Sequence, residues 1–224
     1  MRLLLLVAAA SLTACSGLPP ETLPALKGGE VVTGVTLAFD MQNRLNPDVG
    51  AWFGAGLGHG VDASIGVDLP AMLVISGPAA AGFPLLGIPP GLSVRKTFEN
   101  GLGVGVGSGS RFLFTAGRDS SHAITHLSTA GVFVTTASRE DRMVQGRATL
   151  HVGYAQVRRP NTAATERGLA VHVAGQAGPS VALGDTARVL VPIRVQGGAF
   201  VWPRRSVVQG PTFGLGAQMH EGWK

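Results

Sequence analysis

Residues 61–69, Val-Asp-Ala-Ser-Ile-Gly-Val-Asp-Leu, alternate between apolar side chains and small or acidic ones. Successive side chains of an extended strand point to opposite faces of a sheet, so this period of two predicts a β-strand with one apolar and one polar face. A surface helix would instead need apolar residues at intervals of three and four. The stretch therefore favours an all-β fold.

The same alternation recurs along most of the chain, and turn-forming residues separate the runs. Tight turns are expected at 59–60, 100–101, 117–119, 139–141 and 184–185, and Asn100-Gly101 predicts a type I′ hairpin turn. Short connections between consecutive strands predict an antiparallel up-and-down β-barrel of about eight to ten strands. The domain is expected to cover residues 31–224. Its expected strands are 31–39, 50–58, 61–69, 92–98, 102–115, 123–137, 144–157, 168–176, 187–202 and 210–219.

Glycine accounts for 33 of the 224 residues, and it recurs at every second position in 54–58 and 103–109. The dinucleotide-binding fingerprint requires Gly-x-Gly-x-x-Gly at the start of a helix, and no run in the chain matches it. Alternating glycine instead leaves one face of a strand bare, which allows sharp curvature or the close approach of another layer. These glycines predict a structural role, and no cofactor is expected.

The N-terminus has the composition of an export signal. Met1-Arg2 precedes an apolar run and then small residues, a segment too short to span a bilayer as a helix. Leu12-Thr13-Ala14-Cys15 resembles the lipobox of bacterial lipoprotein precursors. The resemblance implies that residues 1–14 are a removed signal peptide and that acylated Cys15 anchors the protein in membrane lipid. Ser16, where Asp would favour inner-membrane retention in this family, implies the outer membrane.

Residues 15–30 contain three prolines and no sustained periodicity, so they are expected to form the lipidated N-terminus and a tether. Cys15 is the only cysteine, which excludes an intramolecular disulfide. The formal charge of +5 does not indicate a nucleic-acid partner, because the basic residues are scattered and lack interleaved aromatic residues. The apolar segment 70–91 is expected to be a loop or a short helix that covers one end of the barrel or contacts lipid.

Two architectures are consistent with strands in which apolar and polar side chains alternate. In a membrane barrel the apolar face contacts lipid and the polar face lines the lumen, whereas in a soluble barrel or sandwich the apolar face points inward. The glycine-rich pattern of residues 31–224 resembles the small barrels of bacterial outer-membrane proteins. In that arrangement the charged residues of the polar faces would form ion pairs in a narrow lumen. These residues are Asp62, Asp68, Arg95, Arg147, Arg188 and Arg194.

One arrangement suggests catalysis. His126 and Ser128 would share a face of a strand, so that the imidazole could take the proton of the serine hydroxyl. Glu140, twelve residues after Ser128, could supply the carboxylate that orients the imidazole. The pair resembles the His-x-Ser of the lipid A 3-O-deacylases, which implies an acyl hydrolase, although in that family Asn tends to follow the serine and here Thr129 does. No Gly-x-Ser-x-Gly or His-Glu-x-x-His is present. A metal held by His122, His126 and His151 is a further, less favoured alternative.

We therefore expect a non-enzymatic outer-membrane lipoprotein with a structural role or passive binding or transport at the cell envelope. No catalytic or metal-binding residue is assigned, and Cys15 is the one assigned site. The partners are membrane lipid, through acylated Cys15, and an apolar ligand or an envelope protein. The alternatives are a membrane-embedded hydrolase of lipid A that uses His126 and Ser128, and a lipid-tethered periplasmic binding or adaptor domain.

The lipid anchor is directly testable. Replacing Cys15→Ser should abolish incorporation of labelled palmitate in growing cells, because the acyl groups of such a precursor are carried by the cysteine. Ser16→Ala, next to it, should leave the labelling unchanged. Equal labelling of the Cys15→Ser variant and the original chain would contradict the assignment.

Overall fold

The computed structural model describes residues 25–40, 48–70, 91–116, 122–137, 144–158, 165–202 and 205–222. All regular structure in these residues is β, and none of them belongs to a helix long and apolar enough to cross a membrane. The strands are β1 (Val31–Asp40), β2 (Asp48–Gly58), β3 (Val61–Pro70), β4 (Gly91–Thr97), β5 (Leu102–Ala116), β6 (His122–Ala137), β7 (Val144–Arg158), β8 (Thr165–Ala182), β9 (Ala187–Leu190), β10 (Ile193–Trp202) and β11 (Arg205–Glu221).

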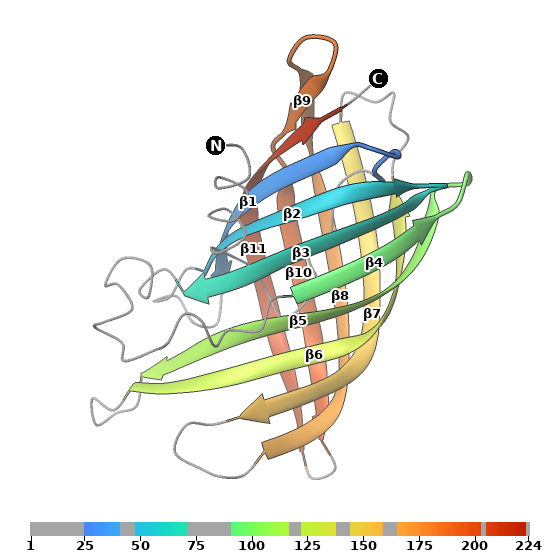
Figure 1. Cartoon of the computed structure of the whole chain (residues 1–224). Coiled ribbons are helices and arrows are strands. Elements are labelled where there is room, and N and C mark those ends of the chain that lie inside the picture. The colour runs from blue at the N-terminus through green and yellow to red at the C-terminus, as the bar shows by residue number, and fades with distance from the viewer. Residues whose placement is uncertain are drawn as a thin grey trace.

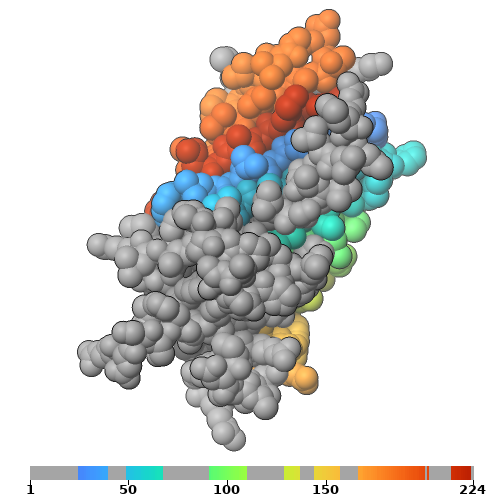
Figure 2. All heavy atoms as spheres, turned by 60° about the vertical axis from the view of Figure 1, so that its left-hand side comes forward, coloured from blue at the N-terminus to red at the C-terminus, as the bar shows by residue number. Residues whose placement is uncertain are grey.

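The strands form one closed antiparallel sheet (Figure 1). Each strand pairs with its sequence neighbours, except that β9 and β10 do not pair with each other, and β1 pairs with β11 over ten residue pairs to complete the barrel. In Figure 2 the blue β1 lies between the red end of β11 and the cyan β2. The predicted up-and-down barrel is therefore confirmed.

Strands β9 and β10 occupy one position around the barrel, because both lie between β8 and β11. The barrel thus has ten strand positions although it has eleven strands. The single strand predicted over 187–202 is interrupted at Pro192, which has no backbone N–H to donate. The ladder continues on both sides of the break, where Val191 N donates to Pro179 O (3.1 Å) and Gly216 N donates to Pro192 O (2.8 Å).

The register is staggered. Following paired residues once around the barrel from His220 on β11 leads back to β11 at Val207. A closed sheet with such a stagger must have strands that tilt against the barrel axis. The tilt is visible in Figure 1.

Side chains are partitioned in the opposite sense to a soluble protein. Polar and charged side chains point into the lumen and are buried, among them Asp62, Arg95 and Gln145. Large apolar side chains point outward and are exposed on most of the strands, as Val106, Val132 and Leu150 are. Of the two architectures that the sequence left open, the structure has the one expected for a membrane barrel.

Glycines of the inner face make room for bulky luminal neighbours. A Cβ built at Gly105 would lie 2.4 Å from Cζ of Phe133, and one built at Gly34 would lie 2.4 Å from Cε2 of Trp52. Each aromatic ring therefore lies over a glycine of the adjacent strand. The interpretation of alternating glycine as a bare face that permits close approach is confirmed.

The turn between β4 and β5 differs in type from the prediction. Asn100 does not have a positive φ, whereas Gly101 has a φ of 81°, and Gly101 N donates to Phe98 O. This is a type I turn followed by a left-handed glycine, so the hairpin is confirmed and the type I′ assignment is wrong. Positive φ at both central residues occurs instead between β2 and β3, at His59 (52°) and Gly60 (72°).

The glycine packing leads to a stability prediction. Gly105→Ala should destabilise the barrel by about 1–3 kcal/mol, because the new methyl group would overlap Phe133 and the carbonyl of Val94. Gly175→Ala is the matched control, since a Cβ there meets nothing within 4 Å. Urea unfolding in detergent micelles, followed by tryptophan fluorescence, measures both. Equal unfolding midpoints would contradict the packing argument.

Candidate functional site

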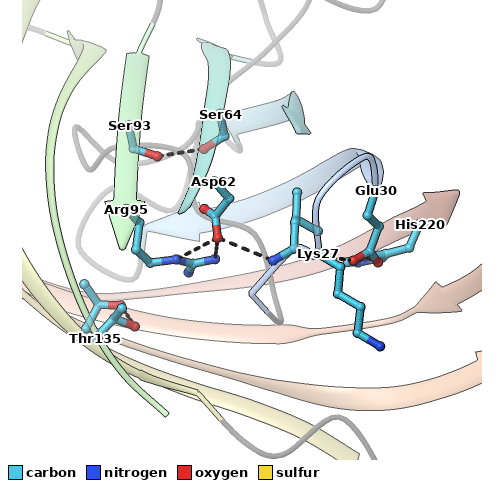
Figure 3. Close-up of polar contacts among 10 residues, drawn as sticks. Lys27, Glu30, Asp62, Ser64, Ser93, Arg95, Thr135 and His220 are labelled. Atoms are coloured by element: carbon cyan, nitrogen blue, oxygen red, sulfur yellow. Dashed lines mark hydrogen bonds and ion pairs between the residues drawn. The ribbon is translucent and has the colours of Figure 1, made fainter. Parts of the chain in front are cut away.

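The described polar contacts concentrate in the lumen near the end where β1 begins and β11 ends (Figure 3). We call Leu26, Glu30, Asp62, Arg95 and His220 the terminal layer. Its members come from β3, β4, β11 and the segment before β1. All five are buried, with 2% or less of their surface exposed.

The centre of the layer is a buried ion pair. Arg95 donates to Oδ2 of Asp62 from both Nε (3.1 Å) and Nη2 (2.6 Å). The two residues are direct cross-strand partners on β3 and β4. The side chains are only 2% and 3% exposed, so each charge depends on the other for compensation. The predicted luminal ion pairing is confirmed for these two residues.

The segment 25–30 enters the barrel, although residues up to 30 were expected to form a tether. Leu26 N donates to Oδ2 of Asp62 at 3.4 Å, and Leu26 packs with Val32 and Trp52. Backbone bonds join the segment to β2, from Gly29 N to Gly56 O (3.0 Å) and from Gly56 N to Glu30 O (2.8 Å). The contacts of this segment with the barrel thus begin at Leu26, five residues before the expected boundary at Val31.

Glu30 links this segment to the last strand. Nδ1 of His220 lies 3.2 Å from Oε1 of Glu30, and because an ionised carboxylate only accepts, the imidazole donates. Oε2 of Glu30 accepts from Lys27 N at 2.9 Å. Both carboxylate oxygens therefore hold the chain where it enters the barrel.

Neutral polar pairs line other parts of the lumen. Ser64 and Ser93 share a hydrogen bond of 2.7 Å between β3 and β4, and Thr149 donates to Thr135 at 3.3 Å between β7 and β6. Each pair consists of inward residues that are direct partners on adjacent strands, so their hydroxyl groups form hydrogen bonds with each other along the wall of the barrel.

Three further arginines of the inner face, Arg147, Arg188 and Arg194, lie on β7, β9 and β10. Arg147 and Arg194 both pair with Gln176 of β8, which places them in one row across three strands. Arg188 lies apart from this row, because it pairs with Ala182 of β8, six residues beyond Gln176, and with His220 of the terminal layer. Arg147 and Arg188 are 5% and 4% exposed, and Arg194 is half-buried.

The structure does not bring together the three histidines considered for a metal. His126 pairs with Arg158 of β7, and His151 lies seven residues from Arg158 on the same strand, or about 23 Å at 3.3 Å per residue. His151 instead neighbours His172, with ring centroids 6.1 Å apart. No group of three metal-ligating side chains occurs among the described residues.

Several sequence-based assignments fall outside what the structure describes. Cys15, Glu140, most of segment 70–91 and the turns at 117–119 and 139–141 lie beyond the described residues. His126 and Ser128 lie on β6, where their backbones pair with Arg158 and Gln156. The hydrolase hypothesis, which needs Glu140 beside His126, therefore stays a hypothesis.

Sequence reasoning missed the roles of Leu26 and Glu30. Glu30 continues the inward parity of Val32 and Gly34, and this was the one available signal. Leu26 belongs to no alternating run, and nothing in the sequence places it inside the barrel.

The buried ion pair gives a second stability prediction. Asp62→Ala should cost about 3–5 kcal/mol of unfolding free energy, because Arg95 would remain buried without its carboxylate. The double variant Asp62→Ala with Arg95→Ala should lose much less than the sum of the two single losses. Ser64→Ala serves as the nearby control. Additive losses in denaturant titrations would show that the pair is not coupled.

Comparison with known proteins gives similarity in structure only. No family model matches the chain, and no curated protein matches its sequence. Neisserial surface protein A (NspA) is 9% identical with a TM-score of 0.40, over 87% of this chain and 95% of that one. The N-terminal β-barrel domain of Pseudomonas aeruginosa OprF is 8% identical with a TM-score of 0.36, over 87% and 99%. The outer membrane protein OprG from Pseudomonas aeruginosa is 10% identical with a TM-score of 0.34, over 89% and 96%.

Proposed function

We propose that this chain is a non-enzymatic β-barrel that spans the bacterial outer membrane, with a structural or passive transport role at the cell envelope. The observation that carries the proposal is the outward position of the large apolar side chains. Val106, Val132 and Val152 are cross-strand neighbours on β5, β6 and β7, and they are 56%, 59% and 36% exposed. In water such a continuous apolar surface is unfavourable, whereas in a bilayer it contacts lipid.

Strand length and closure support the same proposal. A tilted strand needs about 9–11 residues to cross a bilayer, and apart from β4 and the interrupted β9 every strand has at least ten. The β1–β11 ladder joins the first strand to the last, so each described strand has a partner strand on both sides. Closed barrels satisfy every backbone group internally, which a hydrocarbon environment requires.

The interior disfavours a soluble, tethered binding domain. Such a domain would bury its large apolar side chains, but the buried apolar side chains larger than alanine in the described residues are few. They are Leu26, Val32, Trp52, Phe133 and Leu190. The buried polar side chains of the described inner wall are mainly serine, threonine, glutamine, histidine and arginine, which are poor partners for a lipid-like ligand.

The connections suggest the orientation. At the end of the barrel opposite to the terminal layer, two of the connections between strands are long, namely 41–47 and 71–90. At the same end as the terminal layer, the corresponding connections are short, namely 59–60 and 98–101. Outer-membrane barrels have short periplasmic turns and longer extracellular loops, so we place the terminal layer on the periplasmic side. Nine residues lie between Cys15 and residue 25, and the ten Cα–Cα steps that join these two residues span at most about 35 Å. An acylated Cys15 would therefore insert into the inner leaflet beside the barrel.

Membrane insertion is tested by solubility and by one charged substitution. Residues 16–224, which lack the acylated cysteine, should need detergent to stay monomeric, and Val132→Arg should cost about 2–4 kcal/mol because it puts a charge on the lipid face. Leu183→Arg, in the connection between β8 and β9, is the control and should be tolerated. A monomeric, β-rich domain in plain buffer would refute the proposal.

A further inference from the structure

We propose that the outer face of β7 and β8, at the end of the barrel away from the terminal layer, binds the phosphate of a glycolipid in the outer leaflet. The residues that carry the proposal are Tyr154, Gln156, Arg167 and Leu169, which we call the headgroup patch. The proposal rests on the membrane insertion and the orientation proposed above. It adds a specific lipid partner for one part of the outward surface.

The first step places the patch relative to the bilayer. β7 begins at Val144, and its outward positions 146, 148, 150 and 152 are glycine, alanine, leucine and valine, followed by Tyr154. The ten steps from Val144 to Tyr154, at about 3.3 Å each and a tilt of about 40°, correspond to about 25 Å along the barrel axis. This is the height of the apolar band of an outer-membrane barrel. Tyr154 therefore marks the edge of the band, and Gln156 lies beyond it.

The second step is that β8 shows the same change of polarity at the same level. Tyr154 pairs with Leu169, and Gln156 pairs with Arg167. Tyr154 and Leu169 are 47% and 48% exposed, and Arg167 is also exposed. In Figure 1 this end of β7 and β8 lies at the bottom of the view, away from β9. Tyrosine is typical of the interface between acyl chains and headgroups, so the amide and the guanidinium next to it lie at headgroup level.

The third step concerns the charge of the outer face. Of the strand residues whose side chains the structure describes, the charged ones at outward positions are Lys96, Arg167 and Glu221. Lys96 and Glu221 lie near the terminal layer, where Nζ of Lys96 donates to the carbonyl oxygen of His59. Glu166, next to Arg167 in the chain, has the opposite parity and is directed to the inner face. Arg167 thus gives the outer face a positive charge at the end where the apolar band stops.

The fourth step identifies the ligand by its chemistry. The planar guanidinium of Arg167 can bind two phosphate oxygens at once, which a lysine ammonium cannot do with the same geometry. The amide of Gln156 supplies two further N–H donors for a phosphate or sugar oxygen. Arg158 ends β7 two residues after Gln156, so it has the same register parity and brings a second positive charge to this end of the strand. A phosphorylated glycolipid such as lipid A offers acyl chains to Leu169 and phosphate to Arg167.

The experiment titrates the chain, purified in detergent micelles, with lipid A and counts the bound lipid by native mass spectrometry. We expect lipid A to bind about tenfold more tightly than lipid A from which the phosphates have been removed. Arg167→Gln should weaken the binding of lipid A about fivefold, and adding Arg158→Gln should weaken it further. Arg167→Lys should keep part of the affinity, because it retains the charge but not the fork.

Lys96→Gln is the matched control, since it removes one outward positive charge at the opposite end of the barrel. Its affinity for lipid A should equal that of the unchanged chain. An equal loss in Lys96→Gln and Arg167→Gln would overturn the proposal, because it would show a general attraction of a basic protein for anionic lipid. Displacement of lipid A by inorganic phosphate alone would also overturn it, because the ligand would then be the free anion.

Insertion is scored separately, by flotation of the unchanged chain with phospholipid vesicles. A chain that does not float would refute the membrane proposal, and the lipid site with it. A chain that floats but binds lipid A and its dephosphorylated form equally would refute the lipid site alone.

Discussion

Closure of the sheet is the constraint on which the rest of the structure depends. The β1–β11 ladder joins residues from the two ends of the domain, Val31 with Glu221 through to Asp40 with Thr212. Without it, two strand edges would present unpaired N–H and C=O groups, each of which costs free energy when no partner replaces the lost hydrogen bond. Closure also fixes which face of every strand is inside. Once the sheet is closed with the apolar face outward, the polar residues must find their partners within a narrow lumen.

The lumen meets that demand mainly by cross-strand pairing. Asp62 with Arg95 and Ser64 with Ser93 are direct neighbours on β3 and β4, so the register that builds the ladder also builds the polar contacts. Glycine at inward positions provides the space that large luminal side chains need, as Gly105 does for Phe133. The same device admits the backbone of Lys27 at Gly56. Bare inward positions thus explain how a barrel of this size holds both its own side chains and a chain segment.

Much of the fold could be predicted because its information is local. The expected run 61–69 became β3 (Val61–Pro70) and the run 144–157 became β7 (Val144–Arg158), each within one residue at both ends. The strand predicted over 187–202 failed at Pro192, where the missing N–H interrupts pairing that the alternation alone does not reveal. The turn at Asn100-Gly101 was placed correctly but given the wrong type, because the backbone torsion of Asn100 depends on how the two strands meet.

By itself the sequence determined the positions of the strands, the places of most turns and the division of each strand into an apolar and a polar face. Only the tertiary structure decided which face points inward, since a period of two is the same whether the sheet closes one way or the other. It alone placed Leu26 in the lumen and brought Glu30 to His220, 190 residues along the chain. Such contacts depend on the register accumulated around the whole closed sheet, and no local pattern encodes that register.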